Sequence, residues 1–324
     1  MLQKVIYRLR REWRDRYYAA RKASYWSQFR GSRVLIHHGV VAENPTAFNA
    51  RFVRIKDLEA QLIFFKRNFH IATLTDFVER NYPQDRYTLV LTFDDGYKNN
   101  LSHVLPLLEK HKVPACFFAT SILSAGQDIL WADHLDLGFR FSPEKITIDG
   151  RDYEKSGRQY IDRDSGTPLK EQCKEEDFAF KQEMMKSVSA GFKDLPELRD
   201  YWQLMSAEDL RLLNKSDYAE VGSHGHFHNN YANVKASEAR EDMRMSKEYL
   251  EEVMQTSVDF LAYPDGSYTR EVVALGEELG YQYQFSTGHL FEEDELDDRL
   301  RSRLGINPFI GVEHQAKAMI DGHY

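Results

Sequence analysis

Apolar and polar positions alternate along most of the chain in two rhythms, one typical of buried strands and the other of amphipathic helices. Continuous apolar and β-branched runs, typical of strands covered on both faces, occur at 34–37, 87–93, 113–119, 218–222 and 260–263. Apolar residues three or four positions apart, which predict helices, occur at 55–69, 101–110, 237–254 and 270–279. Weaker strand patterns lie at 281–286 and 303–306. This alternation predicts an α/β protein with a parallel sheet or barrel.

Two segments depart from this rhythm. Residues from about 125 to 215 contain a strand–turn–strand pattern near 146–153 and a Lys/Glu-rich helical stretch near 171–188. We interpret them as an insertion on the barrel rim that shapes a substrate cleft. Residues 1–33 form a basic, helical N-terminal extension, which leaves 34–324 as the main domain.

Composition narrows the class of protein. A chain of 324 residues with 42% hydrophobic and 13% aromatic residues is typical of a globular protein. Its net charge of −8 argues against a general nucleic-acid binder. Two cysteines are too few for a disulfide framework. No apolar run reaches the roughly 18 residues of a membrane span, and no apolar segment of a secretory signal follows the first basic residues. The expected location is therefore the cytoplasm.

The N-terminal extension is strongly basic. It carries ten Lys and Arg residues against Glu12 and Asp15, with Trp and Tyr side chains interleaved among them. Such a helix can lie on an anionic membrane surface, which predicts peripheral contact of residues 1–30 with the inner membrane surface. It can equally dock on the acidic main domain of its own chain.

The candidate chemistry begins where the strand at 87–93 ends, at Asp94, Asp95 and Gly96. Catalytic groups of parallel α/β proteins lie beyond the carboxyl ends of the strands. Adjacent strand residues point in opposite directions, so one carboxylate can bind a cation while the other accepts a proton. An Asx-turn or a helix cap is the structural alternative.

Three histidines, His224, His226 and His228, fall within five residues after the strand at 218–222. Imidazoles together with one carboxylate form the usual first shell of a catalytic zinc that keeps an open position. These histidines therefore favour a metal site over a simple turn at Asp94 and Asp95.

Taken together, Thr92-Phe93-Asp94-Asp95-Gly96, Ser223-His224-x-x-x-His228 and Tyr263-Pro264-Asp265-Gly266 resemble the polysaccharide deacetylases of the NodB-homology type, carbohydrate esterase family four. Ile36-His37-His38-Gly39-Val40 resembles the opening strand of one branch of this family, with His37 in place of its Tyr. The resemblance covers roughly 34–124 and 216–310.

The resemblance implies a deformed (β/α)7 barrel, a divalent metal that is usually Zn²⁺, and removal of acetyl groups from N-acetylated sugars. It implies that Asp94 is the catalytic base and that Asp95, His224 and His228 bind the metal. Backbone N–H groups near Asp265 and Gly266, together with the metal, are then candidates for holding the oxyanion.

Two departures from the family pattern concern catalytic groups. The family usually carries an Arg two residues before the Pro of its third motif, where this chain has Ala262. Arg303 is our candidate for the missing guanidinium, with Arg301 behind it. The usual late Leu-x-His acid is not evident, so His38 is our candidate acid and His314 the second choice.

We therefore expect a metal-dependent N-deacetylase acting on an N-acetylated sugar, in a polysaccharide or in a lipid- or nucleotide-linked precursor. Pro264, Asp265, Gly266 and Trp131 are the candidate substrate-binding residues, with Trp131 either stacking on a sugar or anchoring the insertion. The alternatives are a hydrolase of a non-sugar amide on the same scaffold and a catalytically silent carbohydrate-binding protein.

Overall fold

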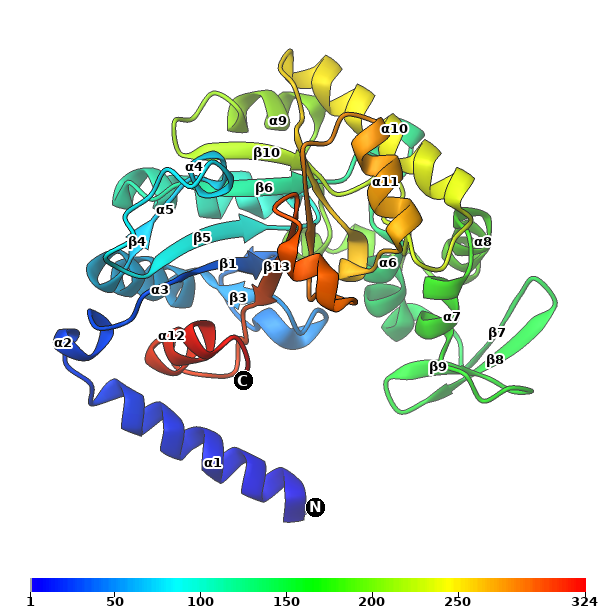
Figure 1. Ribbon diagram of the computed structural model, residues 1–324. Coiled ribbons are helices and arrows are strands. Elements are labelled where there is room, and N and C mark those ends of the chain that lie inside the picture. The colour runs from blue at the N-terminus through cyan, green and yellow to red at the C-terminus, as the bar shows by residue number, and fades with distance from the viewer. Residues whose placement is uncertain (1) are drawn as a thin grey trace.

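The computed structural model describes residues 2–324, and its centre is a closed barrel of seven parallel strands (Figure 1). β1 pairs with both β5 and β13, and this double pairing closes the ring. A short strand, β4 (His70–Ile71), extends the sheet beside β5. In spatial order the barrel strands are β1 (Ser32–His37), β13 (Leu300–Gly305), β12 (Tyr283–Ser286), β11 (Phe260–Ala262), β10 (Ala219–Ser223), β6 (Ala115–Ala119) and β5 (Thr88–Phe93).

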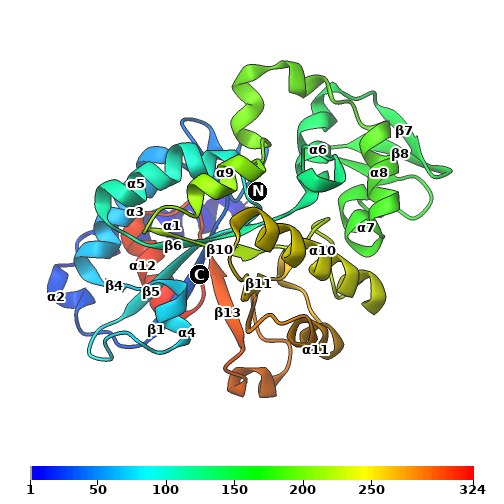
Figure 2. The same cartoon turned by 90° about the horizontal axis from the view of Figure 1, so that it is seen from above.

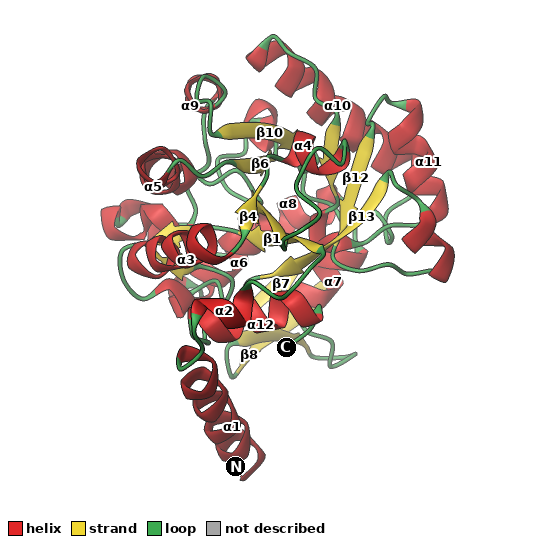
Figure 3. Ribbon diagram, turned by 60° about the vertical axis from the view of Figure 1, so that its left-hand side comes forward, coloured by secondary structure: helices red, strands yellow, loops and turns green. Residues whose placement is uncertain are grey.

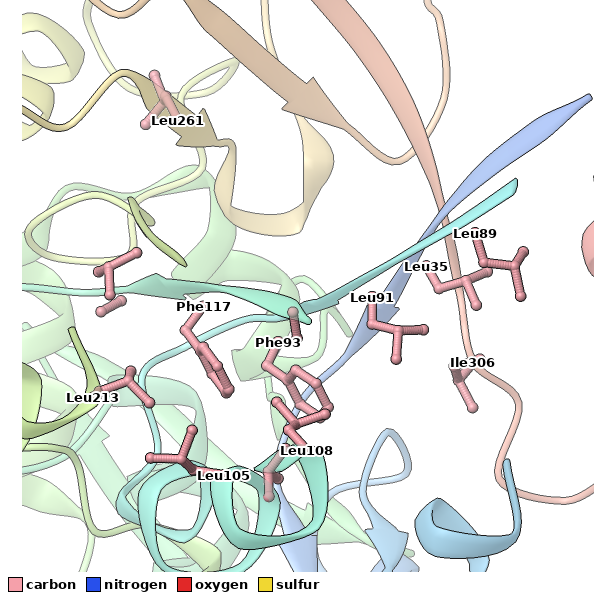
Figure 4. Packing of buried hydrophobic residues seen from close by; sticks show 14 of the residues in the cluster. Leu35, Leu89, Leu91, Phe93, Leu105, Leu108, Phe117, Leu213, Leu261 and Ile306 are labelled. Atoms are coloured by element: carbon pink, nitrogen blue, oxygen red, sulfur yellow. The ribbon is translucent and has the colours of Figure 1, made fainter. Parts of the chain in front are cut away.

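Alternation along the strands divides the core into two layers. On β5, Leu89, Leu91 and Phe93 belong to the large apolar cluster between the barrel and its helices, whereas Val90 belongs to a second cluster inside the barrel. Figure 4 shows the outer layer around α5, where the side chains of the strands meet those of the helix. Every second residue counted from Val90 therefore points toward the barrel axis, and Asp94 is one of these residues.

Helices cover the outside of the barrel (Figures 2 and 3). The predicted pattern of apolar positions places Leu58, Leu62 and Phe65 on the buried face of α3. The helices that wrap the barrel are α3 (Ile55–Asn68), α4 (Leu74–Val78), α5 (Leu105–His111), α9 (Ala207–Leu213), α10 (Ala236–Met254), α11 (Arg270–Glu278) and α12 (Val312–Asp321). Two short strands, β2 (Val40–Val41) and β3 (Val53–Arg54), flank the loop that follows β1.

The segment between β6 and β10 leaves the barrel and forms a lobe beside it (Figure 2). A three-stranded antiparallel sheet packs there against three helices. Its elements are α6 (Trp131–Gly138), β7 (Lys145–Ile148), β8 (Arg151–Ser156), β9 (Gln159–Asp162), α7 (Leu169–Glu175) and α8 (Phe178–Ser187). The helical stretch expected at 171–188 is thus two helices, separated where the Asp177 side chain caps α8. Leu210 and Leu213 of α9 belong to the main core, so α9 packs with the barrel rather than with the lobe.

The basic N-terminal extension forms α1 (Leu2–Ala19) and a short α2 (Ala23–Trp26). α1 runs outward from the barrel and meets α12 near the C-terminus (Figure 1). The Asp15 carboxylate accepts hydrogen bonds from the backbone of Gly311 and from the ring of His314. Among residues 2–324, none of the helices combines the length and the apolar character needed to cross a membrane.

Candidate active site

The carboxyl ends of the barrel strands surround a cavity of about 160 Å³. His38 follows β1, Asp94 follows β5, and His224 follows β10. Strands that are distant in sequence therefore place polar residues around the same cavity at one end of the barrel. The polar side chains that line the cavity include His38, Arg51, Asp94, His224, His228 and Asp265. The predicted convergence of motifs from three parts of the chain is therefore present in the structure.

Asp95, His224 and His228 form a compact group of potential metal ligands, and one ligand atom from each lies within 4.8 Å of the other two. Oδ1 of Asp95 is 3.4 Å from Nε2 of His224 and 3.2 Å from Nε2 of His228. All three side chains are buried. The two imidazoles hold the pKa of Asp95 well below its usual range, against the opposing effect of burial.

The donor set fits a cation. Oδ1 of Asp95 is a buried oxygen that receives no hydrogen bond from any described residue. Nδ1 of His224 lies 2.8 Å from the carbonyl oxygen of Ala262, which can only accept a hydrogen bond. Nδ1 therefore carries the hydrogen, and the lone pair of a neutral His224 at Nε2 faces Asp95. This is the arrangement by which proteins orient histidine ligands of metals.

Asp94 is the carboxylate of the pair that does not belong to the group of potential metal ligands. The Arg303 guanidinium donates to both of its oxygens, over 2.7 and 2.8 Å, and Nη1 of Arg303 also lies 3.1 Å from Oγ1 of Thr92. Burial opposes ionisation of Asp94, but Arg303 and His224 lower the pKa of this carboxyl overall. Asp94 is therefore a carboxylate at neutral pH and can accept a proton.

The guanidinium expected at the position of Ala262 comes instead from β13. Ala262 lies on β11, two strands away in the barrel, and is fully buried. Arg301, the reserve candidate, pairs with Asp298 and does not contact Asp94. Arg303 alone thus supplies the missing group.

Three of the eight non-glycine residues with a positive φ in the described part of the chain lie at this site. Asp95, His228 and Asp265 adopt positive φ angles of 77°, 53° and 56°, which non-glycine residues rarely do. Gly96 follows with φ of 80°, and a Cβ atom there would lie 3.2 Å from the backbone of Ala119. Such backbone persists only where the surrounding structure enforces it, and it clusters at functional sites.

The loop that carries the histidines is held by Asp242 of α10, a residue that the sequence analysis missed. This buried carboxylate accepts hydrogen bonds from the backbone N–H groups of His226 and Phe227 and from the side chains of Asn229 and Tyr231. No motif marks an acidic residue inside a helix as a loop anchor, so only the fold reveals it.

His226 points away from the metal ligands. Its Nδ1 lies 2.6 Å from the hydroxyl oxygen of Ser121, and the side chain is buried. His226 is therefore not part of the group of potential metal ligands, which consists of Asp95, His224 and His228.

The two acid candidates differ in position. His38 lines the cavity, and burial together with Arg51 lowers its pKa to about 3. His314 lies on α12, where it pairs with Asp15 of α1 at 2.8 Å, away from the cavity. The second choice is therefore wrong, because packing of the N-terminal helix uses His314.

The structure decides between the two expected roles of Trp131 and corrects two further expectations about substrate contacts. Trp131 is only 2% exposed and donates to the carbonyl oxygen of His228, so its ring anchors α6 to the metal loop instead of stacking on a sugar. Pro264 is buried behind the cavity wall, which Asp265 and Gly266 form. The Gly266 N–H is already bonded to the carbonyl oxygen of Tyr263. The expected oxyanion donors therefore reduce to the N–H of Asp265.

Arg51 is a further residue at the cavity that the sequence analysis missed. It is exposed at the end of the loop between β2 and β3 and lines the cavity together with His38. A single Arg in a polar loop carries no recognisable signal, because its importance arises from where β1 and β3 place the loop.

Comparisons with known proteins agree with this fold and site. The family model described as polysaccharide deacetylase matches residues 81–142 and 177–284, just over half of the chain. The deacetylase PplD of Streptococcus pyogenes, solved in complex with acetate, is 15% identical with a TM-score of 0.54, over 89% of this chain and 97% of that one. IcaB from Ammonifex degensii is 16% identical with a TM-score of 0.53, over 90% and 98%.

A polysaccharide deacetylase from Bacillus cereus is 18% identical with a TM-score of 0.56, over 89% of this chain and 68% of that one. No sequence among the curated proteins matches. The solved structures share the deacetylase barrel, and the family model covers both the Asp94–Asp95 motif and the histidine motif. The chain belongs to the polysaccharide deacetylase family.

Proposed function

We propose that this protein is a metal-dependent hydrolase that removes the acetyl group from an N-acetylated sugar, in a polysaccharide or in its precursor. Family membership supports a deacetylase. The observation that carries the proposal is the division of labour between two neighbouring carboxylates. Asp95 presents an unpartnered oxygen to two imidazoles. Both oxygens of Asp94 accept hydrogen bonds from Arg303, and Nε2 of His224 lies farther from Asp94, at 3.9 Å.

Asp95, His224 and His228 would hold the metal, Zn²⁺ or another divalent transition metal. Such a cation, when bound, activates a water and polarises the acetyl carbonyl. Of these ligands, the carboxylate supplies the negative charge and the two imidazoles supply neutral nitrogen donors, as in known catalytic zinc sites. Three protein ligands leave a further position open for water and substrate.

In this proposal Asp94 accepts the proton of the attacking water. Arg303 fixes the orientation of its carboxylate and keeps it ionised. Burial and Arg51 lower the pKa of His38 to about 3, so His38 is a neutral imidazole at neutral pH. In this proposal it relays to the leaving nitrogen the proton that Asp94 took from the water, which returns Asp94 to its ionised form. The N–H of Asp265 contributes a hydrogen bond to the oxyanion.

The test is acetate release from a panel of N-acetylglucosamine oligomers and lipid- or nucleotide-linked N-acetylated sugars, with metal-stripped protein and protein reloaded with Zn²⁺. Release that depends on the metal and disappears in Asp94→Asn supports the proposal. Hydrolysis of a cyclic ureide or a formamide without activity on any sugar would favour the non-sugar amidase. Binding of glycans without turnover would favour a silent binder.

We further propose that α1 lies on an anionic membrane surface. Its polar side meets the body of the protein, where Asp15 pairs with His314 of α12. The opposite side carries an outward apolar stripe, defined as Ile6, Leu9, Trp13 and Tyr17, whose exposed fractions are 41%, 60%, 64% and 41%. At 3.6 residues per turn these four side chains lie along one face of the helix.

The residues beside the stripe favour a bilayer as the partner. Arg10 and Arg16 flank it, and each basic residue near an anionic bilayer contributes about 1 kcal/mol. Trp and Tyr side chains favour the membrane–water boundary. Pairing of two stripes from two copies would bring these arginines together and is therefore disfavoured.

Sedimentation of the full chain with phosphatidylcholine vesicles containing phosphatidylserine tests this contact. Trp13→Glu should abolish sedimentation, whereas Tyr7→Glu, which makes the same charge change at a 63% exposed position off the stripe, should retain most of it. Equal behaviour of the two variants, or a dimer that depends on Trp13 in light scattering, would rule out the membrane contact.

A further inference from the structure

A second, larger cleft lies next to the metal cavity. It has a volume of about 310 Å³ and forms where the loop between β2 and β3, helix α6 and the β8–β9 hairpin meet. Ala50 lines this cleft, and the next residue, Arg51, lines the metal cavity. The two spaces are therefore neighbours across a single loop.

One wall of the cleft lies outside the part of the chain that the family model matches. The family model skips residues 143–176, which contain β7, β8, β9 and α7. Arg158, Gln159 and Tyr160 of the hairpin and Lys170 of α7 line the cleft. Its ligand preference is thus a property that the family match does not assign.

The walls of the cleft are ordered by specific contacts. The Arg140 guanidinium donates to the carbonyl oxygen of Ala47 and lies 4.2 Å from the ring centre of Phe48, which ties the loop to the end of α6. On the other side, the rings of Phe139 and Tyr160 meet edge to face at 5.3 Å. The Tyr160 ring is only 1% exposed, so these contacts fix the walls of the cleft and do not offer a stacking surface to a sugar.

The charges that line the cleft are mainly positive, although the whole chain has a net charge of −8. The cleft is lined by three basic side chains, those of Arg140, Arg158 and Lys170, and by one carboxylate, that of Asp136. Lys170 is neutralised by Asp136 at 2.5 Å, and Arg140 is occupied by the loop. Arg158 is exposed at the hairpin turn and forms no ion pair with any residue that the structure describes, so its guanidinium is available to a ligand.

We propose that this cleft binds an anionic group attached to a sugar of the substrate, a uronate carboxylate or a phosphate, while the acetylated sugar occupies the metal cavity. The inference rests on the proposed function and specifies its substrate class as an acidic glycan. Arg158 is the residue that selects the charge, because a guanidinium matches a carboxylate or a phosphate with paired hydrogen bonds.

The experiment measures equilibrium binding by calorimetry, independently of turnover. The probes are a hyaluronan tetrasaccharide, which carries carboxylates, a chitobiose with a phosphate at its reducing end, and neutral chitotetraose. The unmodified protein should bind the charged probes at least about tenfold more tightly than the neutral one. The two charged probes distinguish carboxylate from phosphate as the preferred group.

Arg158→Glu should remove this preference and leave the affinity for chitotetraose unchanged. Arg163→Glu is the matched control, because Arg163 is an exposed residue of the same lobe that lies 3.9 Å from Glu154 and does not line the cleft. Equal affinities for charged and neutral probes, or equal effects of the two variants, would overturn the inference. Absence of acetate release from any glycan, with the charge preference intact, would instead count against the proposed function alone.

Discussion

The two terminal nitrogens of the Arg303 guanidinium, Nη1 and Nη2, each donate to one oxygen of the Asp94 carboxylate, although 209 residues separate the two in sequence. The contact is inside the barrel, where both side chains are nearly inaccessible to water. A bidentate pair of this kind fixes the plane of the carboxylate and keeps it charged. Arg303 is therefore a positioning residue for the proposed base.

Replacing Arg303 with Met should change the pH dependence of catalysis. Without the guanidinium, burial becomes the main influence and raises the pKa of Asp94. Since the base works as a carboxylate, the acidic limb of the kcat/KM profile should move to higher pH, and kcat at pH 7 should fall by about 10²-fold or more. Arg301→Met, on the same strand, should leave the profile in place. An unshifted acidic limb in Arg303→Met would contradict this role.

Removing a metal ligand should lower the affinity for Zn²⁺ much more than removing a neighbouring histidine that does not bind the metal. Asp95→Ala should lower the affinity for Zn²⁺, measured by calorimetry, by more than the roughly 10- to 100-fold typical of an outer-shell change. His226→Ala should lower it far less, because His226 contacts Ser121 and not Asp95. Similar losses in both variants would mean that the metal site is not the one assigned.

Asp242 should control metal affinity without touching the metal. In Asp242→Asn, the amide group would face backbone N–H donors that now bond to a carboxylate. We expect Zn²⁺ affinity to fall about 10- to 100-fold and the free energy of unfolding to fall by about 1–3 kcal/mol. Glu241→Gln, which changes the adjacent exposed residue, is the control. Unchanged Zn²⁺ affinity in a folded Asp242→Asn protein would refute the anchoring role.

The stability of the metal-free protein should depend on Asp133. Burial and the nearby Asp95 raise the pKa of Asp133 from 3.8 to about 7. The unfolded chain loses this proton from about pH 4, whereas the folded protein retains it up to about pH 7. Stability contributed by this group is therefore present at low pH and lost as the pH rises toward 7.

Asp133→Asn, which cannot ionise, should match the unmodified protein at pH 4.5 and be more stable at pH 8. At about 1.36 kcal/mol per pKa unit the difference is at most roughly 4 kcal/mol. Urea unfolding at several pH values measures it. A difference between the two proteins that does not change with pH would show that Asp133 is ionised in the folded state throughout.

The strands that carry the candidate catalytic residues were predictable because the patterns that indicate them lie within a few neighbouring residues. The apolar run at 87–93 is β5, and the residues after it, Asp94 and Asp95, lie where the end of a parallel strand must place them. The same holds for His224 after β10. The alternation of strand residues indicated that the two carboxylates have different roles, and the family motifs added which of them is the base and which binds the metal.

Other roles depended on packing between distant segments. Trp is a residue type that often stacks on sugars, yet Trp131 on α6 is buried and donates to the carbonyl oxygen of His228. Histidine is a residue type that often acts as a catalytic acid, yet the ring of His314 pairs with Asp15 of α1. In each case the side chain could serve either purpose, and the contact partner, which is far away in sequence, decides between them.

By itself the sequence determined the strand–helix alternation, the metal-binding residue types and the basic character of the N-terminal helix, because these depend on neighbours within a few positions. Only the tertiary structure decided that β13 supplies the guanidinium to Asp94, that the apolar stripe of α1 faces outward, and that the inserted hairpin forms a cationic cleft beside the metal cavity. The reason is that closure of the barrel sets which distant side chains meet, and local patterns carry no record of that register.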